Sequence, residues 1–386
     1  MINSANVIVQ KYGGSSLATP HKIKEVAEFI KSALRDDSRL CVVVSAMGHT
    51  TNDLIALAYQ VCNDPPKREL DMLISCGERS SMALLAMALD DVGIKAISLT
   101  GSQSGIITND HHMGAEIIAV KPTRVQEAFL THQVVIIAGF QGVSEKKEIT
   151  TLKRGGSDTT AVAMAAALNA DCEIYTDVEG VMDIDPKLAT MPPQMFTRIS
   201  FERMEAMALY GARVMAHDAI TLAKALNVTI RVGQTGDGAS GTAIGLDAPA
   251  LLTKEPEISF THLRAVIQFC VDRDSVANLV NRFGYFLCGS FRDGHFVGYV
   301  SNDIAEEMIN INSHQVIPGL AMITIHLAKN QQALLALSKI AALCKRHDLA
   351  LVDLLLGHNE IFVVVEDGQL SGILASLHAE LRTAAI

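Results

Sequence analysis

The segment 154–187 constrains the fold of this chain more than any other, because it joins a glycine turn, a helix-forming run and a short β run without a break. The turn RGGSDTT leads into AVAMAAALNA, whose alanine, leucine and methionine content favours a helix. EIYTDV follows, a β-rich run that ends in the polar pair Thr176 and Asp177. Residues 157–160 are of the types that cap helices, so we expect the helix to start there with free N–H groups facing outward.

This turn has the composition of an anion-binding site. Unpaired N–H groups and the helix dipole both favour negative charge at a helix N-terminus. Arg154 adds a planar guanidinium that suits a carboxylate or a phosphate. An ordinary, well-capped turn is the competing interpretation, since such turns are common. The combination of Arg154, Asp158 and a second polar strand end favours the functional interpretation.

The region before residue 246 alternates β runs with helical runs. NVIVQKY, LCVVVSAM, KAISLTG, VVIIAGFQG, EIYTDV and VTIRVG predict strands, and apolar residues at helical spacing between them predict helices. Continuous apolar runs such as LCVVVSAM are typical of strands buried on both faces of a parallel sheet. We therefore predict an α/β fold, an open and mostly parallel sheet with helices on both faces.

Lys11 lies at the C-terminal end of the first predicted strand, Asn6–Tyr12, which Gly13 and Gly14 follow. Ligands bind outside the carboxyl ends of strands in sheets of this kind. Glycines let the backbone approach a phosphate closely, and lysine supplies a compact positive charge. A solvated lysine at a strand end is the alternative. The chain has no G-x-x-x-x-G-K-[ST] motif, which excludes a P-loop enzyme.

Further polar residues stand beside glycines. Ser45 and Thr51 flank a turn after the second predicted strand, where an ordinary loop is the alternative. We predict a helix through LISCGERSSMALLAMAL (73–89), and within it Glu78 follows Gly77 just before the long apolar part. An acid that stabilises a helix N-terminus is the simpler interpretation of Glu78 alone.

Composition limits the class of protein. The formal charge of −10 argues against broad nucleic-acid binding. Seven cysteines without a Cys-x-x-Cys pair fit reduced thiols. The N-terminus lacks a signal-peptide pattern, and no apolar run approaches the roughly 20 residues that span a bilayer. His111 and His112 have no metal-ligand spacing, so we predict loop positions for them. We expect a cytoplasmic protein that binds neither nucleic acid nor membrane.

Seven short motifs follow one another through the region 6–245: KYGGSS (11–16), SAMGHTTN (45–52), GERSS (77–81), LTGSQSGI (99–106), AGFQGV (138–143), TTLKRGGSDTTA (150–161) and EIYTDVEGV (173–181). In order and spacing they resemble the amino acid kinase family, and within it the aspartokinases. The resemblance implies transfer of the γ-phosphoryl group of ATP, with Mg²⁺, to the β-carboxylate of L-aspartate. The product, 4-phospho-L-aspartate, begins the pathways to lysine, threonine and methionine or to ectoine.

The resemblance assigns residues to three groups. The catalytic group is Lys11, Asp158 and Arg213. The substrate-binding group is Ser45, Thr51, Glu78, Arg154, Gly156 and Ser157. The nucleotide-binding group is Lys11, Tyr12, Gly13, Gly14, Ser15, Thr176, Asp177, Met182 and Lys187. No residue is assigned as a direct metal ligand, because oxygen ligands and water leave no clear sequence signature for Mg²⁺.

The assigned roles fit the chemistry of a carboxylate nucleophile. Such a group, with an ordinary pKa of about 4, is ionised at neutral pH and needs no general base. The reaction needs positioning and charge neutralisation instead. By the resemblance, Lys11 holds the transferring phosphoryl group, Arg154 the substrate's α-carboxylate and Glu78 its α-ammonium. Asp158 orients the lysine or the magnesium shell.

The chain departs from the family on the nucleotide side. The family has tyrosine at the position of Met182, arginine at Lys187 and lysine at Arg213, and His-Pro where this chain has Ala216 and His217. These departures leave open a non-catalytic regulator that binds an amino acid. A kinase for another carboxylate, such as N-acetylglutamate, is a third alternative. Glu78 argues against it, because an acylated nitrogen carries no positive charge.

The C-terminal third predicts a second kind of domain. We place a linker at 246–257, and residues 258–386 contain the order β-α-β-β-α twice. This region resembles the paired ACT domains that follow aspartokinase catalytic domains. The resemblance implies an end-product amino acid effector, and free sheet edges imply a homodimer or larger homo-oligomer. A dimerisation module without a ligand is the alternative, because residues 272–274 and 329–330 lack the glycines of the usual effector loop.

Overall fold

The chain forms two compact units. The computed structural model describes residues 7–35, 38–236, 241–245, 258–272, 288–292, 295–301, 315–327, 333–346, 349–357 and 359–383, so the predicted linker 246–257 lies outside the described residues. The first unit comprises Met1–Val181, Thr197–Met204 and Val214–Thr253. The second comprises Met182–Phe196, Glu205–Arg213 and Lys254–Ile386, so it includes two segments from within the predicted catalytic region.

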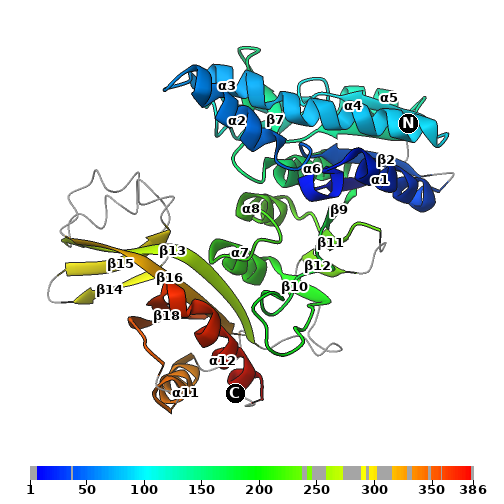
Figure 1. Cartoon of the computed structure of the whole chain (residues 1–386). Helices are drawn as coiled ribbons and strands as arrows, with labels where there is room; N and C mark the ends of the chain where they lie inside the picture. Colours follow the sequence, from blue (N-terminus) through cyan, green and yellow to red (C-terminus); the bar gives the residue numbers. More distant parts are fainter. Residues whose placement is uncertain are drawn as a thin grey trace. The chain divides into compact units, whose positions relative to one another are not determined.

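An eight-stranded sheet forms the centre of the first unit, in the order β10-β12-β11-β9-β1-β2-β6-β3 (Figure 1). Neighbouring strands are parallel except β11 and β12, which confirms the predicted open and mostly parallel sheet. The strands are β1 Val7–Tyr12, β2 Arg39–Val44, β3 Ala96–Leu99, β6 Val134–Ala138, β9 Asp171–Thr176, β10 Arg198–Ser200, β11 Ile230–Gln234 and β12 Thr242–Gly245.

Helices cover both faces of this sheet, as predicted. On one face, Ile30 of α1 and Leu85 of α4 share a buried cluster with Val42 of β2. On the other face, the alanine-rich helix α6 contacts β1, β9 and α8. The helices of this region are α1 Pro20–Ala33, α2 Thr50–Val61, α3 Lys67–Ile74, α4 Cys76–Asp91, α5 Thr123–Ala128, α6 Gly156–Leu168, α7 Phe201–Leu209 and α8 His217–Leu226.

A second, four-stranded sheet in the first unit was not predicted. Its order is β5-β4-β7-β8, with β4 Ile106–Thr108, β5 Ile117–Val120, β7 Gln141–Ser144 and β8 Ile149–Thr151. Strands of three or four residues show too little alternation to be recognised. The predicted strand VVIIAGFQG is in fact β6 and β7, because Phe140 has a φ of +65° and ends the extended run.

The predicted helix LISCGERSSMALLAMAL is also two helices. Its stretch, Lys67–Asp91, comprises α3 and α4, which meet at Ser75. Among the described residues this stretch alone has the length and hydropathy of a membrane span, and 44% of its most apolar window is buried within the protein. Core helices of soluble proteins pass the same test, and Leu85 and Leu89 belong to the core described above.

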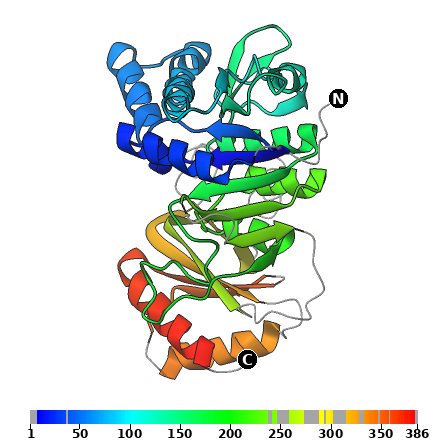
Figure 2. The same cartoon turned by 90° about the vertical axis from the view of Figure 1, so that its right-hand side faces the viewer.

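The second unit contains a six-stranded antiparallel sheet in the order β14-β15-β13-β16-β18-β17. Helices α11 and α12 pack on the same face of this sheet, as Figure 2 shows in orange and red. The elements are β13 Ile258–Asp272, β14 Cys288–Arg292, β15 His295–Ser301, β16 Gln315–Leu327, α11 Ala333–Arg346, β17 Asp353–Leu356, β18 Glu360–Glu366 and α12 Leu370–Thr383. The repeated β-α-β-β-α order is confirmed for its six strands and for α11 and α12. The predicted helices DSVANLVNRF and DIAEEMIN, and residues 273–274 and 329–330, lie outside the described residues.

The two repeats of the second unit join through β13 and β16, which pair along most of their length. In the described part of the sheet, the edge strands are therefore β14 and β17. Arg292 of β14 donates to both carboxylate oxygens of Asp353 of β17 at 2.6 Å, and the Tyr299 hydroxyl donates to the same carboxylate at 2.8 Å. A charged pair thus connects these two edge strands, and the expected homodimer or larger homo-oligomer stays a prediction.

Candidate active site

The tips of β1, β2 and β9 meet at one edge of the large sheet. The Ser45 N–H, just after β2, donates to the Tyr12 carbonyl at 3.1 Å. The Gly13 N–H, just after β1, donates to the Tyr175 carbonyl of β9 at 3.3 Å. The loops that follow these strands therefore lie side by side at the carboxyl edge, where parallel sheets bind ligands.

Lys11 and Asp158 form an ion pair at this edge. The Lys11 Nζ lies 2.7 Å from the Asp158 Oδ1, and the two side chains are only 12% and 9% exposed. The same ammonium lies 3.5 Å from the position that a Cβ on Gly13 would take, so it lies beside the glycine turn. The other Asp158 oxygen accepts a hydrogen bond of 3.3 Å from the Ala216 N–H. The structure thus brings together Lys11, Asp158 and the glycine turn.

The turns after β1 and β2 touch through glycines. A Cβ on Gly14 would lie 2.8 Å from the Ala46 carbonyl oxygen, which leaves room for no side chain there. The Gly48 N–H donates to the Gly14 carbonyl at 3.0 Å, and Gly48 has a φ of +49°. The two backbones can approach this closely because Gly14 and Gly48 have no side chains.

Glu78 lies in the first turn of α4, behind the Ser45–Thr51 turn, and is 3% exposed. The Ala46 N–H donates to the Glu78 Oε1 at 3.2 Å, whereas the Oε2 has no partner among the described residues. Burial raises the pKa of Glu78 to about 7. A Cβ on Gly77 would lie 3.7 Å from the Thr51 Oγ1, so Thr51 lies close to this helix start. A buried carboxylate with one open oxygen suits a cationic ligand.

The start of α6 differs from the prediction. The helix begins at Gly156 after Gly155, whose φ is +81°, and it has no side-chain cap. Residues 157–160 therefore lie inside the helix rather than at its cap. The N–H groups of Gly156 and Asp158 donate at 2.9 Å to carbonyls within the turn, so the expectation of free N–H groups is wrong for these two. Arg154 itself is exposed, which leaves its guanidinium accessible as the cation of this turn.

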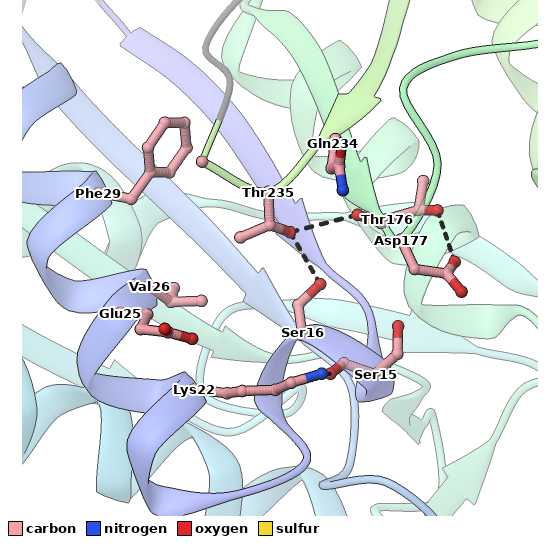
Figure 3. A pocket seen from close by; sticks show the side chains of 11 residues that line it. Ser15, Ser16, Lys22, Glu25, Val26, Phe29, Thr176, Asp177, Gln234 and Thr235 are labelled. Carbon is pink, nitrogen blue, oxygen red and sulfur yellow. Dashed lines mark hydrogen bonds between the residues drawn. The ribbon is translucent and has the colours of Figure 1, made fainter.

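A cavity of about 360 Å³ opens beside these loops (Figure 3). It gathers three of the predicted nucleotide residues, Ser15, Thr176 and Asp177. The Thr235 side chain connects two of its walls: its Oγ1 lies 2.8 Å from the Ser16 Oγ and 3.4 Å from the Thr176 carbonyl (Figure 3). The remaining lining residues are Ser16, Lys22, Glu25, Val26, Phe29, Gln234, Thr235 and Gly236.

Sequence reasoning missed these remaining lining residues. Gln234, Thr235 and Gly236 directly follow the predicted strand VTIRVG, so the rule that ligands bind at strand ends could have identified them. The α1 residues give no such signal, because a helical pattern does not show which part of the sheet edge the helix reaches.

The other predicted nucleotide residues are placed differently. The Tyr12 side chain is buried; its hydroxyl donates to Gln10 at 3.0 Å and its ring stacks on Tyr175 at 5.2 Å. Tyr12 therefore offers only its backbone to the sheet edge. Met182, Lys187 and the predicted catalytic Arg213 belong to the second unit, and their roles stay predictions.

Magnesium has suitable donors at this edge. Among the described residues, no three His, Cys, Asp or Glu side chains are grouped to hold a metal ion. Mg²⁺ bound with a nucleotide needs only one or two carboxylates, since phosphate oxygens and water complete its shell. The exposed Asp177 lines the cavity and Asp158 lies beside Lys11. Each of these carboxylates is an oxygen donor of the kind that Mg²⁺ prefers.

Comparison with known proteins identifies the family. Residues 6–234, more than half of the chain, match the model of the amino acid kinase family. The chain belongs to the amino acid kinase family. Within it, the chain is 50% identical over 240 residues to the aspartokinase of Mycobacterium tuberculosis, and 48% identical over 240 residues to that of Corynebacterium glutamicum. Each match covers 62% of this chain and 57% of the relative, so the match spans less than two thirds of these relatives.

Solved amino acid kinases share the fold. The crystal structure of E. coli aspartokinase III in complex with aspartate and ADP matches with a TM-score of 0.82 and 20% identity, over 97% of this chain and 100% of that one. The aspartate kinase of Synechocystis matches with a TM-score of 0.57 and 29% identity, over 98% of this chain and 70% of that one. The α/β unit and the antiparallel unit are thus both elements of a known amino acid kinase architecture.

Proposed function

We propose that this chain is an aspartate kinase, which transfers the γ-phosphoryl group of ATP to the β-carboxylate of L-aspartate. The observation that carries this proposal is the meeting of a held ammonium and a buried carboxylate at one sheet edge. Lys11 lies over the Gly13 turn, and Glu78 lies behind the adjacent Ser45 turn with one open oxygen. The 50% identity to the aspartokinase of M. tuberculosis supports the choice of substrate.

Each charge has a part in the reaction. The β-carboxylate oxygen of aspartate attacks the γ-phosphorus, and the bond to the bridging oxygen of ADP breaks. Lys11 neutralises charge on the transferring group, because two anions must approach each other. Glu78 binds the α-ammonium and Arg154 the α-carboxylate, which orients the β-carboxylate towards the phosphoryl group. No residue needs to remove a proton from the nucleophile.

We place the nucleotide at the cavity beside β1, β9 and β11. Ser15, Thr176 and Asp177 line this cavity, and Ser15 directly follows the Gly13-Gly14 turn. The complex of E. coli aspartokinase III with ADP supports an adenine nucleotide. Asp177 and Asp158 are the carboxylates through which Mg²⁺ would be held. The roles of Met182, Lys187 and Arg213 in nucleotide binding are part of this proposal.

The C-terminal region has a regulatory role in this proposal. We assign residues 1–245 to catalysis, 246–257 to a linker and 258–386 to a tandem ACT-like region. E. coli aspartokinase III is known in complex with lysine and aspartate in a T-state. By analogy, an end-product amino acid would bind the ACT-like region of a cytoplasmic homo-oligomer. Coupling requires that the effector bind two states of the protein with different affinity.

An acceptor panel tests the function. The purified chain is mixed with Mg-ATP, hydroxylamine and one of L-aspartate, L-glutamate or N-acetyl-L-glutamate, and the trapped acyl hydroxamate is measured. We expect product with L-aspartate, and much less with N-acetyl-L-glutamate because its nitrogen is uncharged. Product with another acceptor alone would overturn the substrate assignment. Calorimetric binding of L-aspartate without turnover would show a non-catalytic regulator instead.

A further inference from the structure

Asp71 is a fully buried carboxylate outside the proposed active site. It lies in α3, and its side chain is 0% exposed. Its Oδ2 lies 2.6 Å from the His112 Nδ1, and its Oδ1 accepts from the Met113 N–H at 3.1 Å. The Thr151 hydroxyl donates a short hydrogen bond to the same Oδ1. One carboxylate therefore connects a helix, a loop and the last residue of β8.

His112 lies in a loop, as predicted. Its side chain is nevertheless only 21% exposed, because it packs against Asp71. Its loop also pairs with the end of β8, where the Ala115 N–H donates to the Thr151 carbonyl at 2.9 Å. The loop and α3 thus hold Thr151 through both its side chain and its backbone.

Thr151 is the start of the turn that carries Arg154. Leu152 and Lys153 separate the two residues. The Leu152 N–H donates to the Phe140 carbonyl at 2.9 Å, and Leu152 packs so closely on the first residue of α6 that a Cβ on Gly156 would lie 2.6 Å from its Cβ. The turn is therefore held at its start by Asp71 and at its end by α6.

The Arg154 side chain depends on this support. It is exposed and long, so the position of its guanidinium is only as well defined as the backbone that carries it. Misplacing a substrate-orienting group by about 1 Å can cost a large factor in rate. A buried carboxylate is a poor way to gain stability, because removing it from water costs much of the free energy that its bonds return. The hydrogen bonds to the Asp71 carboxylate are directional, however, so they fix the positions of the groups that make them.

We propose that Asp71 and His112 are positioning residues, which act through Thr151 to place Arg154 for the α-carboxylate of the acceptor amino acid. The inference rests on the proposed function, because it takes Arg154 as the clamp for that carboxylate. Neither residue touches the substrate. Loss of the network therefore weakens capture of the acceptor amino acid and leaves the nucleotide cavity, which no residue of the network lines, unchanged.

The first experiment compares Thr151→Val with Thr151→Ser. Valine keeps the shape but removes the hydroxyl that bonds Asp71, whereas serine keeps the hydroxyl. We expect Thr151→Val to raise the KM for L-aspartate roughly tenfold, the size of one hydrogen bond to a charged group, with the KM for ATP within about twofold of wild type. Thr151→Ser should keep both constants near wild type. Equal values for the two variants, or equal rises in both KM values, would overturn the proposal.

The second experiment tests His112 in the same way. His112→Asn keeps an N–H donor near the position of the Nδ1 that contacts Asp71, and His112→Leu keeps bulk without a donor. Leucine should raise the KM for aspartate, and asparagine should keep it closer to wild type. Asp110→Asn is the matched control, because Asp110 lies on the same loop in an exposed pair with Lys146 at 2.7 Å. An effect of Asp110→Asn as large as that of His112→Leu would contradict the assignment.

Hydrogen exchange separates failure of the inference from failure of the proposed function. Exchange of the Leu152 and Gly156 amides is measured in wild type, Thr151→Val and Asp71→Asn. We expect faster exchange at these two amides in the variants and no change at the Gly13 amide. This result needs no substrate, so it remains decisive if aspartate is not phosphorylated. Unchanged exchange at Leu152 and Gly156 would overturn the positioning role even if aspartate is the substrate.

Discussion

The tip of β1 and the start of α4 lie at the same sheet edge. The charged side chain of the first has an oppositely charged partner, whereas that of the second has none among the described residues. Lys11 has its counter-charge within the protein, since Asp158 lies 2.7 Å away. Glu78 accepts a hydrogen bond from the Ala46 N–H through one oxygen, and its other oxygen is buried without a partner among the described residues. A charge that is already paired is held in place before any ligand arrives. A buried charge without a partner is costly until a ligand supplies one.

The difference indicates which group serves the reaction and which serves binding. Transition-state stabilisation needs a preorganised charge that does not move as the reaction proceeds. Lys11 meets this condition. Substrate recognition can use an unsatisfied group, because the ligand then removes a desolvation cost that the free protein bears. Glu78 meets that condition, and its raised pKa is the physical sign of it.

Replacing Lys11 should have the largest effect. Lys11→Ala removes the ammonium and leaves Asp158 as an uncompensated negative charge beside the transferring phosphoryl group. We expect kcat to fall about 1000-fold, the range seen when a phosphate-stabilising cation is removed. The measurement is steady-state hydroxamate formation, with circular dichroism to confirm folding. A well-folded variant with near-normal kcat would break the assignment of Lys11 to catalysis.

Replacing Glu78 should affect binding instead. Glu78→Gln keeps an oxygen for the Ala46 N–H but removes the charge for the α-ammonium. We expect the KM for aspartate to rise about 100-fold, as for loss of a buried hydrogen bond to a charged group, with the KM for ATP unchanged. If kcat fell as for Lys11→Ala while the KM for aspartate stayed constant, the contrast between the two regions would be wrong.

The free energy of unfolding should depend on the protonation of Glu78. Its pKa is about 7 in the folded protein and 4.5 in the unfolded chain, so between these values the folded state binds more protons. Stability is therefore highest below about pH 4.5 with respect to this group and decreases as pH rises towards 7, by about 3 kcal/mol in total. Urea denaturation of wild type and Glu78→Gln at pH 6 and pH 8 measures it. The free energy of unfolding of wild type, relative to that of Glu78→Gln, should be lower at pH 8 than at pH 6.

The same titration should appear in substrate binding, as the smallest effect. Only ionised Glu78 attracts the α-ammonium, so the ionised fraction limits binding below the pKa of about 7. We expect the KM for aspartate to fall about tenfold between pH 6 and pH 8, since one pH unit below the pKa reduces the ionised fraction about tenfold. The KM for aspartate of Glu78→Gln should be nearly flat over this range. A wild-type KM for aspartate that rises between pH 6 and pH 8 would contradict the role of ionised Glu78 in binding the α-ammonium.

Local patterns were sufficient to predict the large sheet and which residues lie at its carboxyl edge. Lys11 lies near the end of a β run and Gly13 and Gly14 follow that run, and a strand of a parallel sheet must present its carboxyl end at the binding edge. The start of α6 was misjudged, because Ser157 and Asp158 are good caps by type, yet Gly155 in a left-handed conformation allows the helix to begin before them. The type of a side chain therefore predicts a helix cap only where the backbone conformation places that residue at the cap position.

The sequence by itself determined the alternation of strands and helices, the glycine turns, and the family, because these depend on residues that are neighbours along the chain. Only the tertiary structure decided which hydrogen-bond or ion-pair partner each charged side chain has. Glu78 lies behind Ala46, and Asp71 binds His112 and Thr151, residues 41 and 80 positions away. Packing brings these groups together, and burial then changes the free energy of their charges, which no local pattern can specify.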